Sequence, residues 1–334
     1  MKLIIQIPCY NEAESLPATL RDLPRTVPGF SEVEWLVIND GSSDDTAEVA
    51  RKCGVDHLVG FTKNQGLAKA FLAGLDGCIR LGADVIVNTD ADNQYVAADI
   101  PALVAPILAG KADMVIGVRP INKIASFSLL KKLLQKLGSA VVRLVSKTDI
   151  PDAPSGFRAI SREAALRINV FNEYTYTLET IIQAGQKNIA ICSVPVGVNG
   201  VMRPSRLVKS IPSYIRRSIL TICRIFVVYK AFRFFMSLGV LFSSLGMLVG
   251  LRYLYYYLTA GGAGHVQSLI LTAILLGVGF QTMLTAFLAD LLAVNRRLLE
   301  DVQYRVRVLE HPNRDGVPLR QQSDLIRGDL DSTK

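Results

Sequence analysis

The stretch VIVNTDADNQY, residues 85–95, begins as an apolar run and ends in a turn rich in side-chain oxygens. A short apolar run bounded by polar turn residues is typical of a buried strand. Asp90 and Asp92 follow the predicted strand one residue apart, so their carboxylates should point roughly the same way. Carboxylate pairs are hard oxygen ligands that suit Mg²⁺ or Mn²⁺. The pattern therefore predicts a divalent metal that bridges two phosphates.

Four other short apolar runs are also predicted to be strands: 3–8, 35–38, 57–61 and 114–118. Helical patterns separate most of them, among them NEAESLPATLRDL, with Asn11 as its predicted cap, and SSDDTAEVARKC. This alternation predicts an α/β fold with a mostly parallel sheet and helices on both faces.

A polar cluster follows each predicted strand, and in open sheets of this kind ligands bind beyond the carboxyl ends of the strands. The clusters are PCYNEAE, NDGSSDD, TKNQGLAKA, TDADNQ and GVRP. Asp40, the turn 64–66 and the carboxylate pair would then line one crevice. That shared location favours a ligand site over the alternative, a solvated turn in which the aspartates cap a helix. Neither GxGxxG nor GxxxxGK[ST] occurs, so those phosphate loops are excluded.

Two runs near the C-terminus, 234–251 and 266–289, contain no charged residue. Their length predicts membrane spans, here placed at 234–258 and 266–291, rather than a buried hairpin of soluble-core helices. Five Lys or Arg residues lie in 211–233 and four in 292–310, whereas the connecting TAGGAGH has none. The positive-inside rule therefore predicts a cell (inner) membrane protein whose termini and first domain are cytoplasmic.

The chain carries a net charge of +8, and much of it flanks the predicted spans. An anionic membrane surface explains this charge more simply than nucleic acid does. The five cysteines show no paired or metal-like spacing, which indicates reduced thiols in a cytoplasmic domain. The first apolar run is too short for a signal peptide.

Four ordered motifs resemble the family-2 glycosyltransferases: PCYNEAESL, VINDGSSDDT, NQGLAKAFLAGL and NTDADNQY. The resemblance covers roughly residues 3–210. PSGFRAISREAAL at 154–166, a basic segment and two spans are most similar to polyprenyl-phosphate glycosyltransferases such as dolichyl-phosphate mannose and glucose synthases. The resemblance implies a glycosyltransferase A-type, Rossmann-like sheet. It also implies a metal-dependent enzyme that moves a hexose from a nucleotide-diphosphate sugar to undecaprenyl or dolichyl phosphate.

The resemblance also implies roles for residues in and near these motifs. Asp90 and Asp92 would hold the metal and the diphosphate, and Asp40 would contact the base or ribose. The other donor-binding residues expected are Pro8, Tyr10, Asn11, Glu12, Lys63, Gly66, Ala91 and Arg119. The expected catalytic residues are Asp92, Asp152 and Arg158. The acceptor phosphate would be bound by Gln94, Ser155, Arg203, Ser205 and Arg206.

Several of these assignments have an alternative that the residues leave open. Asp152 lies in DIPDAP, which also fits an ordinary proline turn. Arg119 and Arg158 fit structural ion pairs as well as phosphate contacts. Arg203 and Arg206 either hold the lipid phosphate with their planar forks or only attract anionic headgroups.

A lipid phosphate is already ionised at neutral pH, so a strong general base is dispensable. The three histidines accordingly lie outside the motif clusters. A single displacement would invert the anomeric configuration. The only tryptophan is Trp35, so the Gln-x-x-Arg-Trp signature of processive polymerising relatives is absent. The alternatives are a non-catalytic nucleotide-sugar-binding or scaffolding module, or a transferase with another lipid acceptor. The sugar, nucleotide and polyprenyl length are not encoded in these motifs.

The predicted organisation has five parts. These are a catalytic domain at 1–210, a basic amphipathic juxtamembrane segment at 211–233, the two spans, and a partly helical cytoplasmic tail at 292–334. The tail sequence NRRLLEDVQYRVRVLE has apolar and basic residues at helical spacing. It is predicted to lie on the membrane or to pair with another subunit, so a homo-oligomer held by the membrane helices or the tail is compatible with the sequence.

Overall fold

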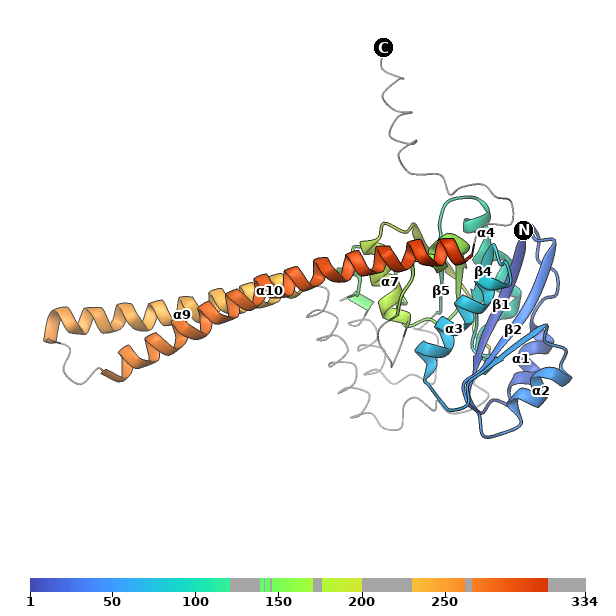
Figure 1. The fold of residues 1–334 in the computed structure, drawn as a ribbon, viewed down its shortest axis with the longest axis horizontal. Coiled ribbons are helices and arrows are strands. Elements are labelled where there is room, and N and C mark those ends of the chain that lie inside the picture. The colour runs from blue at the N-terminus through green and yellow to red at the C-terminus, as the bar shows by residue number, and fades with distance from the viewer. Residues whose placement is uncertain are drawn as a thin grey trace, which may run out of the picture.

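The computed structural model describes residues 1–120, 139–140, 142–144, 146–170, 176–199, 230–261 and 266–311. An α/β domain stands at one end, and a long hairpin of two helices extends away from it (Figure 1). This arrangement confirms the predicted fold class.

A seven-stranded mixed sheet forms the centre of the α/β domain, in the order β3-β2-β1-β4-β6-β5-β7. The strands are β1 Lys2–Cys9, β2 Glu32–Asn39, β3 His57–Gly60, β4 Val85–Asn88, β5 Met114–Val118, β6 Arg158–Ser161 and β7 Ile191–Pro195. Only β6 runs antiparallel, between β4 and β5. The first five strands therefore all end at one edge, the carboxyl edge, as the sequence predicts.

Helices cover both faces of the sheet, because successive side chains of each strand point to opposite sides. In β1, Ile4 packs with α3 Leu67–Arg80, α6 Arg162–Arg167 and α7 Thr177–Gln186. Its neighbours Leu3 and Ile5 pack with helices of the other face, α1 Leu16–Asp22, α2 Thr46–Lys52 and α4 Ile100–Leu108. The single turn η1 Ala97–Asp99 leads into α4. This double coverage explains why the central strands are almost wholly apolar.

The predicted cap of the first helix is wrong. Helix α1 begins at Leu16 after Ser15, with Pro17 in its first turn. Asn11 lies further upstream with a φ of 54° and uses its side-chain oxygen elsewhere. The second predicted helix does begin after an aspartate, Asp45, and carries Glu48 in its first turn.

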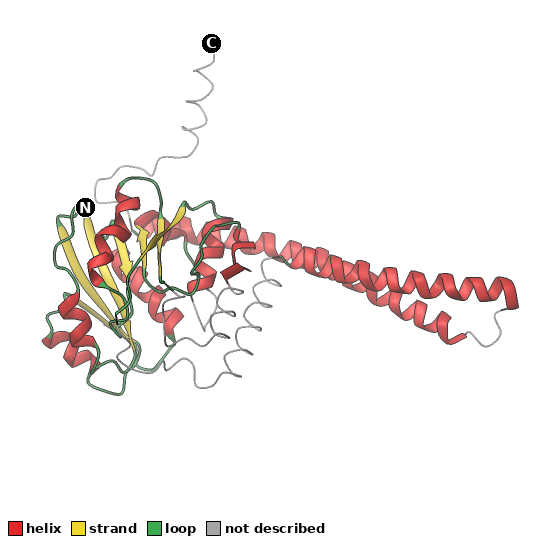
Figure 2. Cartoon of the chain, turned by 180° about the vertical axis from the view of Figure 1, so that it is seen from behind, coloured by secondary structure: helices red, strands yellow, loops and turns green. Residues whose placement is uncertain are grey.

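Two helices of the described chain are long and apolar enough to cross a membrane, Ala231–Thr259 and Val266–Glu310. They form the hairpin of α9 Ala231–Ala260 and α10 Val266–Glu310, seen from both sides in Figures 1 and 2. Close packing between them depends on glycine: a Cβ on Gly279 would lie 2.3 Å from the Ser243 hydroxyl, and one on Gly239 would lie 2.7 Å from Met283.

Helix α10 continues well past the predicted end of the second span at residue 291 and packs against the α/β domain. Lys187 pairs with Glu300 at 3.0 Å, and the Tyr304 hydroxyl donates to Glu163 at 2.9 Å. The Arg307 guanidinium donates to the Ile168 carbonyl at 3.0 Å. One face of the predicted tail helix is thus joined to the α/β domain of its own chain.

Candidate functional site

Hydrogen bonds join the loops that follow β1 and β2 at the carboxyl edge. The backbone N–H of Asn11 donates to the Ser42 hydroxyl at 2.9 Å, and its side-chain oxygen accepts from Ser43 N at 2.8 Å. The N–H of Glu12 donates to the Thr46 hydroxyl at 2.8 Å. The motifs PCYNEAE and NDGSSDD, far apart in sequence, are therefore joined by hydrogen bonds into one side of the carboxyl edge.

Asp40 organises the next loop of this edge. Its two carboxylate oxygens accept from the backbone N–H groups of Gln65, at 2.7 Å, and Gly66, at 2.9 Å. Gly41 permits the approach of this loop, because a Cβ there would lie 2.3 Å from the Lys63 carbonyl carbon. Asp40 is only 3% exposed, so its visible role is to hold the 63–66 turn. Its predicted contact with a donor base or ribose stays a prediction.

Asp90 and Asp92 are half-buried in the turn after β4. Burial and the neighbouring Asp92 carboxylate raise the pKa of Asp90 to about 7, and the charge of Arg119 opposes this rise. A divalent cation between two such carboxylates would relieve their repulsion, so the pair fits the predicted metal. The described residues contain no group of three or more His, Cys, Asp or Glu that could hold a metal. Phosphate oxygens or water would have to complete the coordination.

Gly156, in the turn before β6, lies directly against the Asp90 carboxylate. A Cβ on Gly156 would lie 3.0 Å from an Asp90 oxygen and 3.1 Å from the Tyr176 hydroxyl. The Gly156 N–H donates to the Tyr95 hydroxyl at 2.9 Å. The motif PSGFR is thereby brought to the carboxylate pair.

A buried amide, Asn88, supports this site from below and is not identified by the sequence motifs as functional. Its side-chain N–H groups donate to the Gly156 carbonyl at 2.8 Å and the Tyr176 hydroxyl at 2.9 Å. Its oxygen accepts from the Gln6 amide at 2.8 Å. Tyr176 in turn stacks on Phe71 with ring centroids 3.8 Å apart. The only signal for Asn88 in the sequence is its position as a polar residue at the end of an otherwise apolar strand.

Arg119 and Asp152 form a two-point ion pair. The Arg119 Nε lies 2.8 Å from one Asp152 oxygen, and a terminal nitrogen lies 3.0 Å from the other. The Asp152 side chain is fully buried and that of Arg119 is 9% exposed. This geometry matches the structural ion pair given as the alternative for Arg119, whose charge also opposes the rise in the pKa of Asp90. The predicted site roles of Arg119 and Asp152 stay predictions.

Arg158 is fully buried behind the turn that precedes β6. Its side chain has no exposed surface, and it donates to the carbonyls of Ala153, Ser155 and Thr177 and to the Thr180 hydroxyl. With its guanidinium occupied in this way, Arg158 ties the 153–157 turn to α7. These contacts give Arg158 a structural role, and its catalytic role stays a prediction.

The other predicted residues fall into three groups. Near the carboxyl edge, Tyr10 and Lys63 are exposed, Glu12 and Gln94 are half-buried, and Pro8 and Ala91 are buried. Ser155 is fully buried beside the Tyr95 phenol. Arg203, Ser205 and Arg206 lie outside the described residues, as does most of the predicted juxtamembrane segment.

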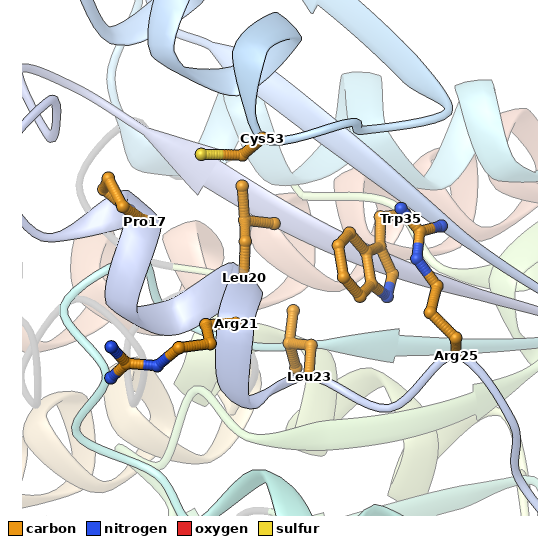
Figure 3. A pocket seen from close by; sticks show the side chains of 7 residues that line it. All are labelled: Pro17, Leu20, Arg21, Leu23, Arg25, Trp35 and Cys53. Carbon is orange, nitrogen blue, oxygen red and sulfur yellow. The ribbon is translucent and has the colours of Figure 1, made fainter.

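A separate shallow hollow of about 340 Å³ lies between α1 and β2 (Figure 3). It is lined by Pro17, Leu20, Arg21, Leu23, Arg25, Trp35 and Cys53. Arg25 covers the Trp35 ring at 3.3 Å from its centroid. None of the predicted site residues lines this hollow, so it is not part of the candidate site.

The doubly covered, mostly parallel sheet with a carboxylate pair after β4 has the architecture of a glycosyltransferase A-type fold. Residues 4–168 match the family model Glycosyl transferase family 2, so this part of the chain is similar to a family 2 glycosyltransferase domain.

The chain is 29% identical over 206 residues to an undecaprenyl-phosphate mannosyltransferase of Micrococcus luteus, covering 59% of this chain and 83% of that protein. It is 28% identical to a polyprenol monophosphomannose synthase of Mycolicibacterium smegmatis, covering 58% of this chain and 76% of that one.

Among solved structures, glucosyl-3-phosphoglycerate synthase of Mycobacterium tuberculosis, in complex with Mn²⁺, UDP and glucosyl-3-phosphoglycerate, has a TM-score of 0.53. The sequences are 17% identical, and the match covers 68% of this chain and 78% of that one. At this identity the likeness shows the fold alone.

Proposed function

We propose that this protein is an inverting glycosyltransferase that moves a hexose from a nucleotide-diphosphate sugar to a polyprenyl phosphate in the membrane. The observation that carries the proposal is the union, in one chain, of a strand-end carboxylate pair with an apolar helical hairpin. The relatives named above are an undecaprenyl-phosphate mannosyltransferase and a polyprenol monophosphomannose synthase, which favours this acceptor over other lipids.

The donor side is built around Asp90 and Asp92, which would hold Mg²⁺ or Mn²⁺. When bound, such an ion would offset the charge of the departing nucleoside diphosphate. The glucosyl-3-phosphoglycerate synthase structure holds Mn²⁺ together with UDP, which supports this assignment. Arg119 would add a fixed positive charge beside the carboxylates. The hydrogen bonds from Asn88 hold Gly156, and with it the PSGFR turn, against Asp90.

On the acceptor side, the lipid phosphate would attack the anomeric carbon directly from the face opposite the leaving group. The attacking oxygen of the lipid phosphate is ionised at neutral pH, so no side chain at the site has to remove a proton from it. Gln94 and Ser155 are described near the carboxyl edge. Arg203, Ser205 and Arg206 stay predictions for binding the phosphate.

The transfer itself is tested with purified protein, a panel of nucleotide sugars and a short polyprenyl phosphate, with lipid products identified by mass spectrometry. We expect one sugar to give a lipid whose mass increases by a single hexosyl unit, and no product from the matching polyprenol without phosphate. Donor binding without transfer to any lipid would favour the non-catalytic alternative.

We further propose that the catalytic domain and both termini face the cytoplasm. A cysteine placed in the 262–265 connection should react with a membrane-impermeant thiol reagent added outside spheroplasts, whereas one placed at the N-terminus should react only after lysis. Equal protection of both positions in intact spheroplasts would contradict a two-span topology.

A further inference from the structure

Helix α10 carries a continuous row of side chains on a seven-residue repeat, which we call the outer stripe. Its spacing alternates between three and four residues, as in the core positions of a coiled coil. The outer stripe consists of Leu271, Ile274, Val278, Gln281, Thr285, Leu288, Leu292, Asn295, Leu299, Val302, Val306 and Leu309.

The outer stripe faces neither α9 nor the α/β domain. Its nine apolar members are exposed by between 44%, at Val278, and 80%, at Leu309. The contacts with α9 come from other positions, such as Gly279, and those with the domain come from Glu300 and Tyr304. The helix therefore has one side joined to its own chain and another side uncovered.

Lipid does not account for the cytoplasmic end of the stripe. Figures 1 and 2 show α10 as one continuous helix, so the residues after 291 lie progressively further from the predicted second span. At 1.5 Å per residue, Leu309 lies about 27 Å along the helix from residue 291, where the predicted span ends. Leu299, Val302, Val306 and Leu309 share this region with Arg305 and Asp301, and an apolar row in such a setting indicates a protein partner.

Gln281 is an independent indication of a partner helix within the membrane. It lies near the middle of the predicted span 266–291, and its side chain is exposed. Among the residues that the structure describes, its amide group has no hydrogen-bond partner. An amide exposed to hydrocarbon is unfavourable, and such residues associate with polar groups on neighbouring helices.

We infer that the outer stripe pairs with the outer stripe of a second copy of this chain. Two copies inserted in one membrane by the same route have the same orientation, so their α10 helices run parallel. A two-fold axis along the pair places Gln281 against its own counterpart, where each amide both donates and accepts. Because a seven-residue repeat drifts by about 20° per heptad on a straight helix, the two helices wind into a left-handed supercoil.

The charges that flank the outer stripe are compatible with this pairing. Each seven-residue repeat has two core positions, of which the first are residues such as 292, 299 and 306. In a parallel pair, the residue just before this first core position meets the residue five places further along the partner helix. Arg305 and Glu310 have this spacing and opposite charges. The preceding flanking pairs, Leu298 with Gln303 and Leu291 with Arg296, bring no like charges together.

Cross-linking of the full-length protein in its native membrane tests the inferred face. We expect Leu299→Cys and Val302→Cys each to form a covalent dimer under mild oxidation. Asp301→Cys, which is exposed but outside the stripe, is the matched control and should stay monomeric, as should the unsubstituted protein. Equal cross-linking at residues 299 and 301, or none at 299 and 302, would overturn the inference.

A second substitution tests the membrane part of the same surface. In the Leu299→Cys background, Gln281→Leu should weaken dimerisation by about 3- to 30-fold, the range for an interhelical hydrogen bond in a bilayer. Thr282→Val is the control, because the Thr282 hydroxyl bonds within its own helix, to the Val278 carbonyl. An unchanged dimer fraction in Gln281→Leu across a dilution series in lipid would refute the pairing of Gln281 with its counterpart.

Discussion

Asp92→Asn is expected to lower the rate of sugar transfer by about 10²- to 10³-fold while leaving the fold unchanged. The substitution removes one negative charge from the pair that would hold the metal. The described contact of its side chain, a hydrogen bond accepted from Gln94 N at 3.1 Å, can also be made by an asparagine oxygen. Initial rates with the donor sugar and polyprenyl phosphate measure the effect, and the thermal unfolding midpoint checks the fold.

Asp149→Asn is the matched control for this experiment, because the Asp149 side chain is 97% exposed and lies outside the carboxylate pair. Its transfer rate should stay within about twofold of the unsubstituted protein, as for most surface changes. If Asp92→Asn retained full activity and EDTA had no effect, the carboxylate pair would not have the role proposed here.

Arg119→Met is expected to reduce the free energy of unfolding of the α/β domain by about 3–5 kcal/mol. Asp152 is fully buried, and its ion pair with Arg119 would be lost, which leaves a carboxylate without its counter-ion. Loss of the positive charge beside Asp90 should also slow transfer. Denaturant unfolding, followed by a probe in the α/β domain, measures the first effect.

Arg80→Met is the control for the buried pair. Arg80 also contacts an aspartate, Asp76 at 2.9 Å, but its side chain is 64% exposed. Removal of this pair should cost about 0.3–0.5 kcal/mol, as is usual for exposed pairs on a helix. If Arg119→Met and Arg80→Met destabilised the domain equally, the burial of the first pair would not govern its contribution.

The five strands before residue 120 could be predicted because a strand buried on both faces is a short apolar run, whatever surrounds it. β6 Arg158–Ser161 was not predicted as a strand, since RAIS contains an arginine and a serine. Its antiparallel place between β4 and β5 is a property of tertiary pairing. The gathering of the polar clusters at the carboxyl edge could be predicted from the strands alone, because parallel strands bring the loops at their ends together.

The individual roles of site residues were less predictable, since residue type does not show which side chain is buried. Arg158 and Arg119 belong to similar polar motifs, but only Arg158 is enclosed by backbone carbonyls. The contact between Asn88 and Tyr176 joins positions 88 residues apart and has no local signal. The charges after residue 291 indicated where the second span ends, and the tail was predicted to be partly helical. No local pattern indicated that α10 continues through the tail and packs against the α/β domain.

The central claim is that the hexose alone, without a phosphate of the donor, is transferred to a lipid phosphate. The most direct test is to identify both products of one turnover. The account predicts release of the nucleoside diphosphate, together with a lipid that gains one hexosyl unit linked through a single phosphate. Release of the nucleoside monophosphate, together with a lipid carrying a diphosphate-linked sugar, would show transfer of a phosphosugar and would contradict the account.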